Sequence, residues 1–265
     1  MLLRVRRATI LAGLLCAGIL AFCARVASGP VGAEWPNEPA GLPLLSEHAW
    51  AVADMTSAGS AGWRNAYPSD YPSRVTIASD ATAPLGDTGN ILEFIYPLGY
   101  DAGTSPGTIY YAFSPSLAEV YLAFWWKADS NWENGPGDTN KMAYIHNQGG
   151  SGQIWVAMSS SDHTTFVYSG QVQGINLYAN VNADVVSLGV WHRIELHVKL
   201  QQAGVASSTV EWWMDNRLQG RYTNINPLDR AINDVQFAPV WGGVGAIKQR
   251  GPNYFWFDHV RVSGH

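Results

Sequence analysis

The chain has 265 residues, of which 47% are hydrophobic, 12% aromatic and only 14% charged. Four of its 16 basic residues and none of its 21 acidic residues fall within positions 1–33, so the remainder carries 12 basic against 21 acidic side chains, a formal net charge of −9. This balance argues against nucleic acid as a partner, because nucleic-acid binding draws on clustered Lys and Arg. An acidic sugar polymer would require a local cluster of basic side chains.

The beginning of the chain has the pattern of a secretory signal peptide over residues 1–33. Three arginines open it, an almost wholly apolar run covers residues 8–24, and residues 31–33 (Val-Gly-Ala) are typical of a cleavage site. The apolar run is shorter than the roughly 20 residues that a spanning helix needs. We therefore expect a secreted protein, extracellular or periplasmic, with no membrane span in the mature chain. Both cysteines, Cys16 and Cys23, lie within the signal, so the mature chain would lack disulfides.

After the signal, the sequence predicts an extended arm followed by one all-β domain. Residues 34–47 are proline-rich and indicate an extended arm or a first edge strand. Over 48–265 no helical period persists, and short apolar or alternating runs recur between turn-forming residues, which predicts an antiparallel β-sandwich or barrel. The predicted strands cover 74–78, 91–97, 108–114, 120–128, 141–147, 153–159, 164–169, 174–180, 191–200, 209–215, 235–241 and 254–262.

The clearest hairpin joins the runs 191–200 and 209–215. Alternation places Ile194, Leu196 and Val198 of the first run on one face, and its charged residues on the other. The sequence therefore predicts a hairpin with one buried and one solvated face. Asn216 then supplies a residue suited to a left-handed turn.

Three motifs give the chain a resemblance to a known superfamily. They are a Gly-x-Trp-His entry to the strand at 191–200, a Trp-x-Asp-Asn hairpin at 213–216, and a final Phe-Asp-His-Val-Arg-Val strand at 257–262. They resemble the second half of concanavalin A-like jelly-roll domains. Within that superfamily the chain is most similar to secreted bacterial polysaccharide-lyase-like proteins, the alginate and glucuronan lyase group, over most of 48–265. The resemblance implies a jelly roll in which one of two antiparallel sheets forms a concave, glycan-binding groove.

The resemblance also implies catalytic positions. Alginate lyases of this fold carry a Gln-Ile-His or Gln-Val-His motif, and Tyr144-Ile145-His146 is similar to it, with Tyr144 in place of Gln. Their Arg-Ser/Thr-Glu motif is matched only by Glu93, without the arginine. A late Tyr-Phe-Lys-Ala-Gly-Val-Tyr segment is echoed by residues 240–249, which offer Lys248 but no matching tyrosine.

β-Elimination of a uronate needs a group that neutralises the carboxylate, a base that removes the C5 proton, and an acid for the leaving oxygen. His146 is the candidate base, and Tyr144, Tyr110 or Tyr111 the candidate acid. Asn147 or Gln148 would hold the carboxylate. The alternative is that His146 is an inert polar residue lining the surface. The residues that we expect to bind sugar are Trp125, Lys127, Asn147, Gln148, Trp155 and Trp241.

Calcium is the one cofactor that the resemblance implies. Jelly rolls of this superfamily often bind a structural Ca²⁺ through an aspartate of the final strand, which here is Asp258, and Asp54 is the candidate for a second carboxylate. The alternative is that Asp258 caps a turn or pairs with an arginine. The sequence contains no Cys or His spacing typical of zinc.

Three classes of function remain open for a protein whose expected partner is an extracellular polysaccharide. The first is a polysaccharide lyase that acts by β-elimination, the second a non-catalytic lectin-like module, and the third a surface structural or filament subunit. A lyase predicts His146, a tyrosine and a cation close together, whereas a binding module predicts aligned exposed tryptophans. A filament subunit predicts apolar edges or an arm that reaches outward. Glycoside hydrolysis is a weaker enzyme hypothesis than β-elimination, because the sequence lacks the Glu-x-Asp-x-x-Glu run of retaining glucanases.

Overall fold

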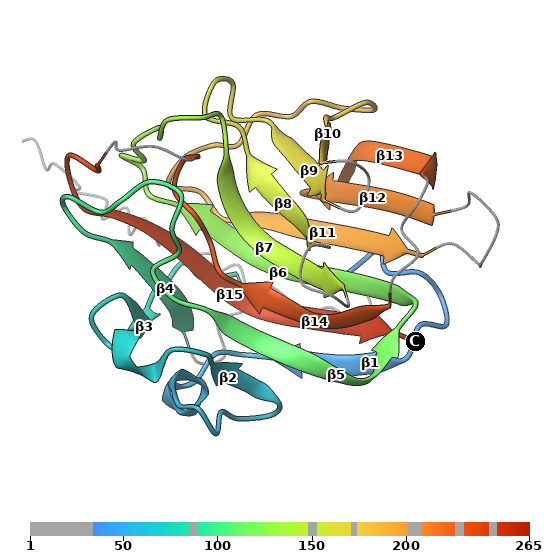
Figure 1. Ribbon diagram of the computed structural model, residues 1–265, viewed down its shortest axis with the longest axis horizontal. Coiled ribbons are helices and arrows are strands. Elements are labelled where there is room, and N and C mark those ends of the chain that lie inside the picture. Colours follow the sequence, from blue (N-terminus) through green and yellow to red (C-terminus); the bar gives the residue numbers. More distant parts are fainter. Residues whose placement is uncertain are drawn as a thin grey trace, which may run out of the picture. The chain divides into compact units, whose positions relative to one another are not determined.

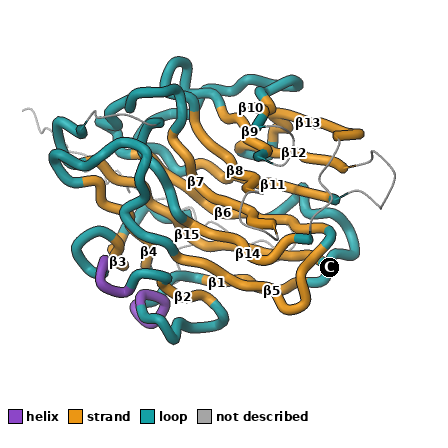
Figure 2. Tube along the Cα trace, viewed as in Figure 1, coloured by secondary structure: helices purple, strands orange, loops and turns teal. Residues whose placement is uncertain are grey.

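The structure is a computed structural model that describes residues 34–84, 89–147, 153–170, 174–200, 208–225, 231–243 and 248–265. The signal peptide predicted for 1–33 lies outside these residues. From Trp35 to His265 the described chain forms a sandwich of two antiparallel sheets (Figure 1). Figure 2 shows that strands and loops make up nearly all of it, with two short 3-10 turns at Val52–Met55 and Pro68–Asp70. No helix within the described ranges is long and apolar enough to cross a membrane.

The first sheet, sheet A, has the strand order β13-β12-β11-β6-β15-β4-β3, with β1 paired to β15. Its strands are β1 (Leu44–His48), β3 (Val75–Ser79), β4 (Asn90–Tyr96), β6 (Glu119–Ala128), β11 (His192–Lys199), β12 (Ser208–Met214), β13 (Arg217–Ile225) and β15 (Asn253–Gly264).

The second sheet, sheet B, has the order β10-β9-β8-β7-β14-β5-β2 and faces the viewer in Figure 1. Its strands are β2 (Trp63–Asn65), β5 (Ile109–Leu117), β7 (Asn140–Asn147), β8 (Gln153–Met158), β9 (Thr165–Ser169), β10 (Ile175–Leu177) and β14 (Ile232–Phe237).

The predicted all-β sandwich is confirmed, and each predicted run overlaps one of these strands. Two strands, β2 and β13, were not predicted, and β1 forms from the end of the predicted arm. The turn between β12 and β13 consists of Asp215 (φ 50°) and Asn216 (φ 68°), the left-handed pair that a two-residue hairpin requires.

The core lies between the sheets and is rich in aromatic rings. Alternation along β6 sends Phe124 inward, where it meets Phe257 of β15 and Phe237 of sheet B. The ring centroids of Phe237 lie 5.2 Å from Phe124 and 4.9 Å from Phe257. These edge-on contacts join the two sheets at the centre of the sandwich.

The outer face of sheet A is covered by the start of the described chain. Trp35 is only 2% exposed and packs on Tyr121 of β6. Beside it, Glu195 of β11 is fully buried and accepts hydrogen bonds from Tyr121 Oη (2.6 Å), Arg193 Nε (3.0 Å) and Asn37 Nδ2 (3.0 Å). The prediction of a solvated face for the β11–β12 hairpin was therefore wrong at Glu195, where the arm and these charge-assisted hydrogen bonds exclude water, whereas Lys199 at the end of β11 is exposed.

Candidate functional site

The outer face of sheet B carries two adjacent rows of polar and aromatic side chains. Directly opposite residues on neighbouring antiparallel strands present their side chains on the same face. Residues of the other parity, such as Ile145 and Val235, are fully buried in the core, so these rows point outward. The first row, from β2 to β10, is Arg64, Tyr110, Gln236, Tyr144, Trp155, Tyr168 and Asn176, and the second contains Ala112, Asp234, His146 and Gln153.

Aromatic rings form a small cluster on this face, separate from the main core. Tyr144, Trp155 and Phe166 are its buried members. The indole of Trp155 stacks on the ring of Tyr168 with centroids 4.5 Å apart and planes 13° apart. Trp155 thus lies on the predicted surface, but it is only 6% exposed. The cluster holds the neighbouring polar side chains in position. Its rings are too buried to serve as a free platform for a sugar ring.

His146 is held by an aspartate on the neighbouring strand. Its Nδ1 lies 2.9 Å from Oδ1 of Asp234, and Gln236 Nε2 donates to the same oxygen at 2.8 Å. An ionised carboxylate only accepts hydrogen bonds, so the proton of a neutral His146 sits on Nδ1. The lone pair is then on Nε2, which has no hydrogen-bond partner among the described residues. This orientation leaves Nε2 able to accept a proton.

Lys141 brings a positive charge to the same face of β7. A β-bulge between Lys141 and Ala143 shifts the register, so that Lys141 faces the same way as Tyr144 three residues later. Its Nζ lies 4.7 Å from the ring centroid of Trp155 and 5.8 Å from that of Tyr144. Among the described residues no carboxylate lies within ion-pair distance of it, and burial lowers the pKa of Lys141.

Tyr144 lies between the lysine and the histidine. Its ring centroid is 5.7 Å from that of His146, and the side chain is 6% exposed. Burial raises the pKa of Tyr144, since a phenolate would lose its hydration there. The phenol keeps its proton at neutral pH, as a tyrosine with its ordinary pKa also does, and it can donate that proton to a strongly basic oxygen. Lys141, Tyr144 and His146 thus bring a cation, an acid and a base to one face of one strand.

A second cation, Arg64, lies at the β2 end of the first row. Its guanidinium carbon is 4.9 Å from the ring centroid of Tyr110. Its Nε is buried without a hydrogen-bond partner, and no carboxylate in the described part of the chain pairs with it. Three strand spacings, roughly 14 Å, separate the backbones of β2 and β7.

Several predicted site residues lie on the other sheet. Glu93, Trp125 and Lys127 face outward from sheet A, where Glu93 accepts a hydrogen bond from Trp256 Nε1 at 2.7 Å. Lys127 pairs with Asp80 and does not approach His146. The structure therefore does not bring these three residues together with Tyr144 and His146.

The remaining predicted residues are dispersed. Trp241 is fully buried and donates from Nε1 to the carbonyl of Glu133 at 2.6 Å, so it is a core residue and does not meet solvent. Lys248 pairs with Asp101 at 2.7 Å in a loop. Tyr111 packs against the core, whereas Tyr110 lies on the outer face. Asn147 ends β7 with its side chain outside what the structure describes, and Gln148 lies outside the described residues altogether.

The two predicted calcium ligands, Asp54 and Asp258, lie on different elements of the described chain. Asp54 is fully buried, and its Oδ2 is taken by His48 Nε2 and the Ala51 amide, both at 2.8 Å. Asp258 lies at a bulge in β15, opposite Trp125. The described ranges contain no group of three His, Cys, Asp or Glu side chains that could hold a metal. A Ca²⁺ ion takes six to eight oxygen ligands, among them backbone carbonyls, so this absence does not test the predicted site, and calcium stays a prediction.

Comparison with solved structures finds a similar fold in alginate lyases, among other proteins. No known protein family matches the sequence, and no curated protein is similar to it in sequence. The PL-14 alginate lyase from Aplysia kurodai has a similar structure, with a TM-score of 0.60 at 11% identity, covering 84% of this chain and 99% of that one. A mutant of the alginate lyase Aly36B in complex with alginate trisaccharide gives 0.56 at 12% identity, covering 83% and 94%.

A third similar structure is the binding domain of Paraclostridial Mosquitocidal Protein 1. Its TM-score is 0.53 at 11% identity, and the match covers 84% of this chain and 49% of that one. At such identities the likeness concerns the fold. The predicted jelly-roll β-sandwich is therefore confirmed as the fold, and the chemistry has to be argued from the side chains.

Proposed function

We propose that this protein is a polysaccharide lyase that cleaves an acidic glycan by β-elimination on the outer face of sheet B. The observation that supports the proposal is the convergence of Lys141, Tyr144 and His146 on one face of β7, with His146 oriented by Asp234. The lyase hypothesis requires such a grouping of cation, tyrosine and histidine. A polar histidine without a catalytic role needs no unpaired cation beside it.

The three groups match the three demands of elimination at a uronate. Nε2 of His146 takes the C5 proton, and the C5–H electrons form the C4–C5 double bond as the bond to the leaving oxygen breaks. Tyr144, which is protonated at neutral pH, donates its proton to that oxygen, because the oxygen becomes strongly basic as its bond to the sugar breaks. Lys141 neutralises the carboxylate, whose negative charge grows as C5 loses its proton.

Local charge favours an acidic substrate despite the acidic chain. Lys141 and Arg64 lack carboxylate partners among the described residues, while basic side chains of sheet A such as Arg193 and Lys127 are paired. Unpaired cations in a partly buried setting attract an anionic polymer more strongly than the same charges in a salt bridge. A polyuronate is therefore the substrate class that this face fits.

A non-catalytic binding module is the second candidate, and a similar fold occurs in a toxin's binding domain. All 12 tryptophans lie in the described residues, and none is exposed. An aligned, exposed tryptophan platform therefore does not support this alternative. The filament alternative predicts apolar edges or an arm that reaches outward, and the second of these features is not supported, because the arm packs on sheet A through the buried Trp35.

The proposal is tested by following the ultraviolet absorbance of the unsaturated product. The protein is incubated with alginate, glucuronan, heparinoid and pectic polymers, alongside His146→Ala and the control His163→Asn. The His163 side chain is half-buried, its hydrogen-bond partner among the described side chains is Asn134, and its positive φ is one that Asn tolerates. We expect absorbance to rise with at least one polymer and His146→Ala to lower the rate by about 10²–10⁴-fold.

Two outcomes would count against elimination. One is the absence of a rise with every polymer while a folded protein is present. The other is equal activity of His146→Ala and the wild type. In the first case affinity electrophoresis with the same polymers distinguishes a binding module from a protein with no affinity for glycans.

A further inference from the structure

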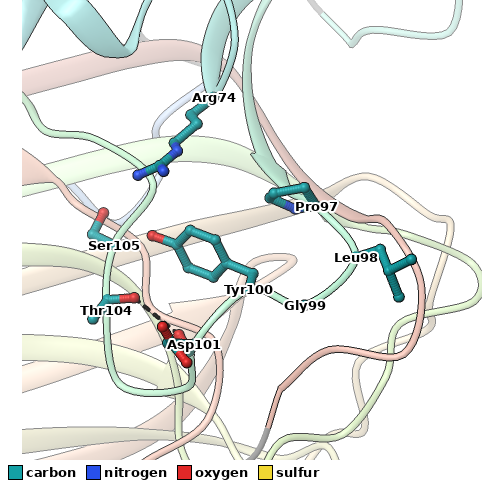
Figure 3. A pocket seen from close by; sticks show the side chains of 8 residues that line it. All are labelled: Arg74, Pro97, Leu98, Gly99, Tyr100, Asp101, Thr104 and Ser105. Carbon is teal, nitrogen blue, oxygen red and sulfur yellow. Dashed lines mark hydrogen bonds between the residues drawn. The ribbon is translucent and has the colours of Figure 1, made fainter.

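A pocket of about 470 Å³ lies at the connection between the sheets, beside residues 97–105, which follow β4 and precede β5 (Figure 3). Arg74, Tyr100, Thr104 and Ser105 line it, and Asp101 lies at its edge. Its volume falls in the range of small-molecule sites, roughly 300–1,000 Å³. It is separate from the Lys141–His146 grouping, and no step of the proposed elimination uses it.

The polar groups of this pocket point toward a common space. Figure 3 shows the guanidinium of Arg74 and the hydroxyl of Tyr100 directed toward Ser105. The guanidinium carbon lies 5.7 Å from the Tyr100 ring centroid, so the ring supports the cation from one side. Tyr100 itself is only 8% exposed and packs edge-on against the buried Tyr96. The ring is thus a fixed wall of the pocket.

Arg74 brings a positive charge to the pocket that forms no ion pair among the described residues. Asp101 is neutralised by Lys248, whose Nζ lies 2.7 Å from Oδ1. Asp70 is the other carboxylate near Tyr100, but it is not within ion-pair distance of Arg74. In the described part of the chain Arg74 has no acidic partner, although its guanidinium presents paired N–H donors that match a carboxylate.

The pocket borders the Lys141 end of the proposed active face. Lys141 and Val240 exchange backbone hydrogen bonds of 3.0 and 3.1 Å, and the next residue, Trp241, accepts one from the Gly103 amide at 3.0 Å. Gly103 lies in the same loop as Tyr100 and Thr104. A polymer that runs along β7 from His146 past Lys141 therefore approaches this loop.

We propose that the pocket is a distal subsite that binds a carboxylate-bearing sugar unit, a uronate, through Arg74. Arg74 pairs with the carboxylate. The hydroxyl groups of Thr104 and Ser105 donate to the carbonyls of Asp101 and Gly107, so they accept from the sugar hydroxyls, and Tyr100 can donate to them. The inference rests on the proposed function in one respect, which is that the bound uronate is a unit of the polymer being cleaved. Binding to the pocket itself requires no catalysis.

The test is an NMR titration with sodium glucuronate, and with glucose as a neutral sugar of similar size. The Lys141→Met variant serves as the background, so that the cation of the active face does not compete. We expect glucuronate to shift resonances of Tyr100 and Thr104. Arg74→Gln should weaken this binding by about tenfold or more, since a charge-assisted pair is lost. The control is Arg217→Gln, because Arg217 is an exposed arginine on β13 that pairs with Asp184.

Equal binding of glucose and glucuronate, or unchanged glucuronate binding by Arg74→Gln, would overturn the inference. Kinetics give a second readout. If the protein is a lyase, Arg74→Gln should reduce the preference in kcat/KM for the polymer over a trisaccharide, and an unchanged preference would also contradict it. If no polymer is cleaved but glucuronate binds the pocket through Arg74, the lyase proposal fails and the uronate site stands.

Discussion

Lys141 is the residue on which the proposed chemistry depends most. Its ammonium nitrogen lies over the indole of Trp155, and it has no acidic neighbour in the described residues. Burial disfavours the charged form, as the lowered pKa of Lys141 indicates. A partly buried cation without a partner lowers the stability of the folded protein. An anionic substrate would supply that partner when it binds, which gives the unpaired lysine a function.

We expect Lys141→Met to lower kcat/KM on a polyuronate by about 10²–10³-fold, because the charge that stabilises the enolate is lost. Methionine keeps the apolar stem against Trp155, so the free energy of unfolding should not fall. Lys199→Met removes an exposed lysine of sheet A that pairs with Glu119, and serves as the control in the same steady-state assay. Equal kcat/KM values for the two variants would exclude Lys141 from the reaction.

At the scale of single elements, alternation predicted some of the site but could not predict its register. Tyr144 and His146 share a face because they are two residues apart, and this followed from the sequence. Lys141 and Tyr144 are three apart and would face opposite ways on a regular strand. Only the bulge at Lys141/Ala143 brings them together. The pairing of β7 with β14, which adds Asp234, depends on contacts between segments far apart in the chain.

The alternation of residues along a strand also could not predict which of the two sheets that strand joins. Glu93 and Lys127 lie on outward faces of strands, as their alternation indicates, but those strands belong to sheet A. In a sandwich, successive strands cross between sheets, so the sequence pattern of a strand does not tell which sheet it joins. Arg64 lies on a strand of only three residues, too short to show alternation.

The edge of sheet A offers a test of stability against pH. Asp80, just after β3, accepts hydrogen bonds from Lys127 and from the Thr82 amide and hydroxyl. Burial alone would raise the pKa of Asp80, but these hydrogen bonds lower it from 3.8 to about 2. Because the folded pKa is depressed, the stabilisation is complete above pH ~4 and is lost as the pH falls toward about 2.

We therefore expect Asp80→Asn to lower the free energy of unfolding at neutral pH by about 1–2 kcal/mol. The difference from the wild type should shrink as the pH falls from about 4 to about 2, as measured by urea unfolding across that range. Asp101→Asn is the control, since its exposed pair with Lys248 should contribute under about 1 kcal/mol. A difference independent of pH would mean that Asp80 acts through packing instead of charge.

Across the whole unit from Trp35 to His265, the two outer faces differ in how they use charge. On sheet A, Glu195, Glu119 and Arg261 are enclosed in pairs with neighbouring side chains. On sheet B, Lys141 and Arg64 remain without acidic partners among the described residues. These charged side chains of sheet A are paired, whereas the two cations of sheet B, within the described ranges, are not. The outer face of sheet B is therefore the surface of this acidic chain that is suited to an anionic polymer.

The most direct test of elimination is the mass balance of the products. A defined uronate oligosaccharide is incubated with the protein in heavy-oxygen water, and the fragments are weighed by mass spectrometry. Elimination breaks the glycosidic bond without adding water, so we predict fragment masses that sum to the mass of the substrate, with no heavy oxygen incorporated during cleavage. Fragments that together exceed the substrate by one labelled water would show hydrolysis and would contradict the lyase assignment.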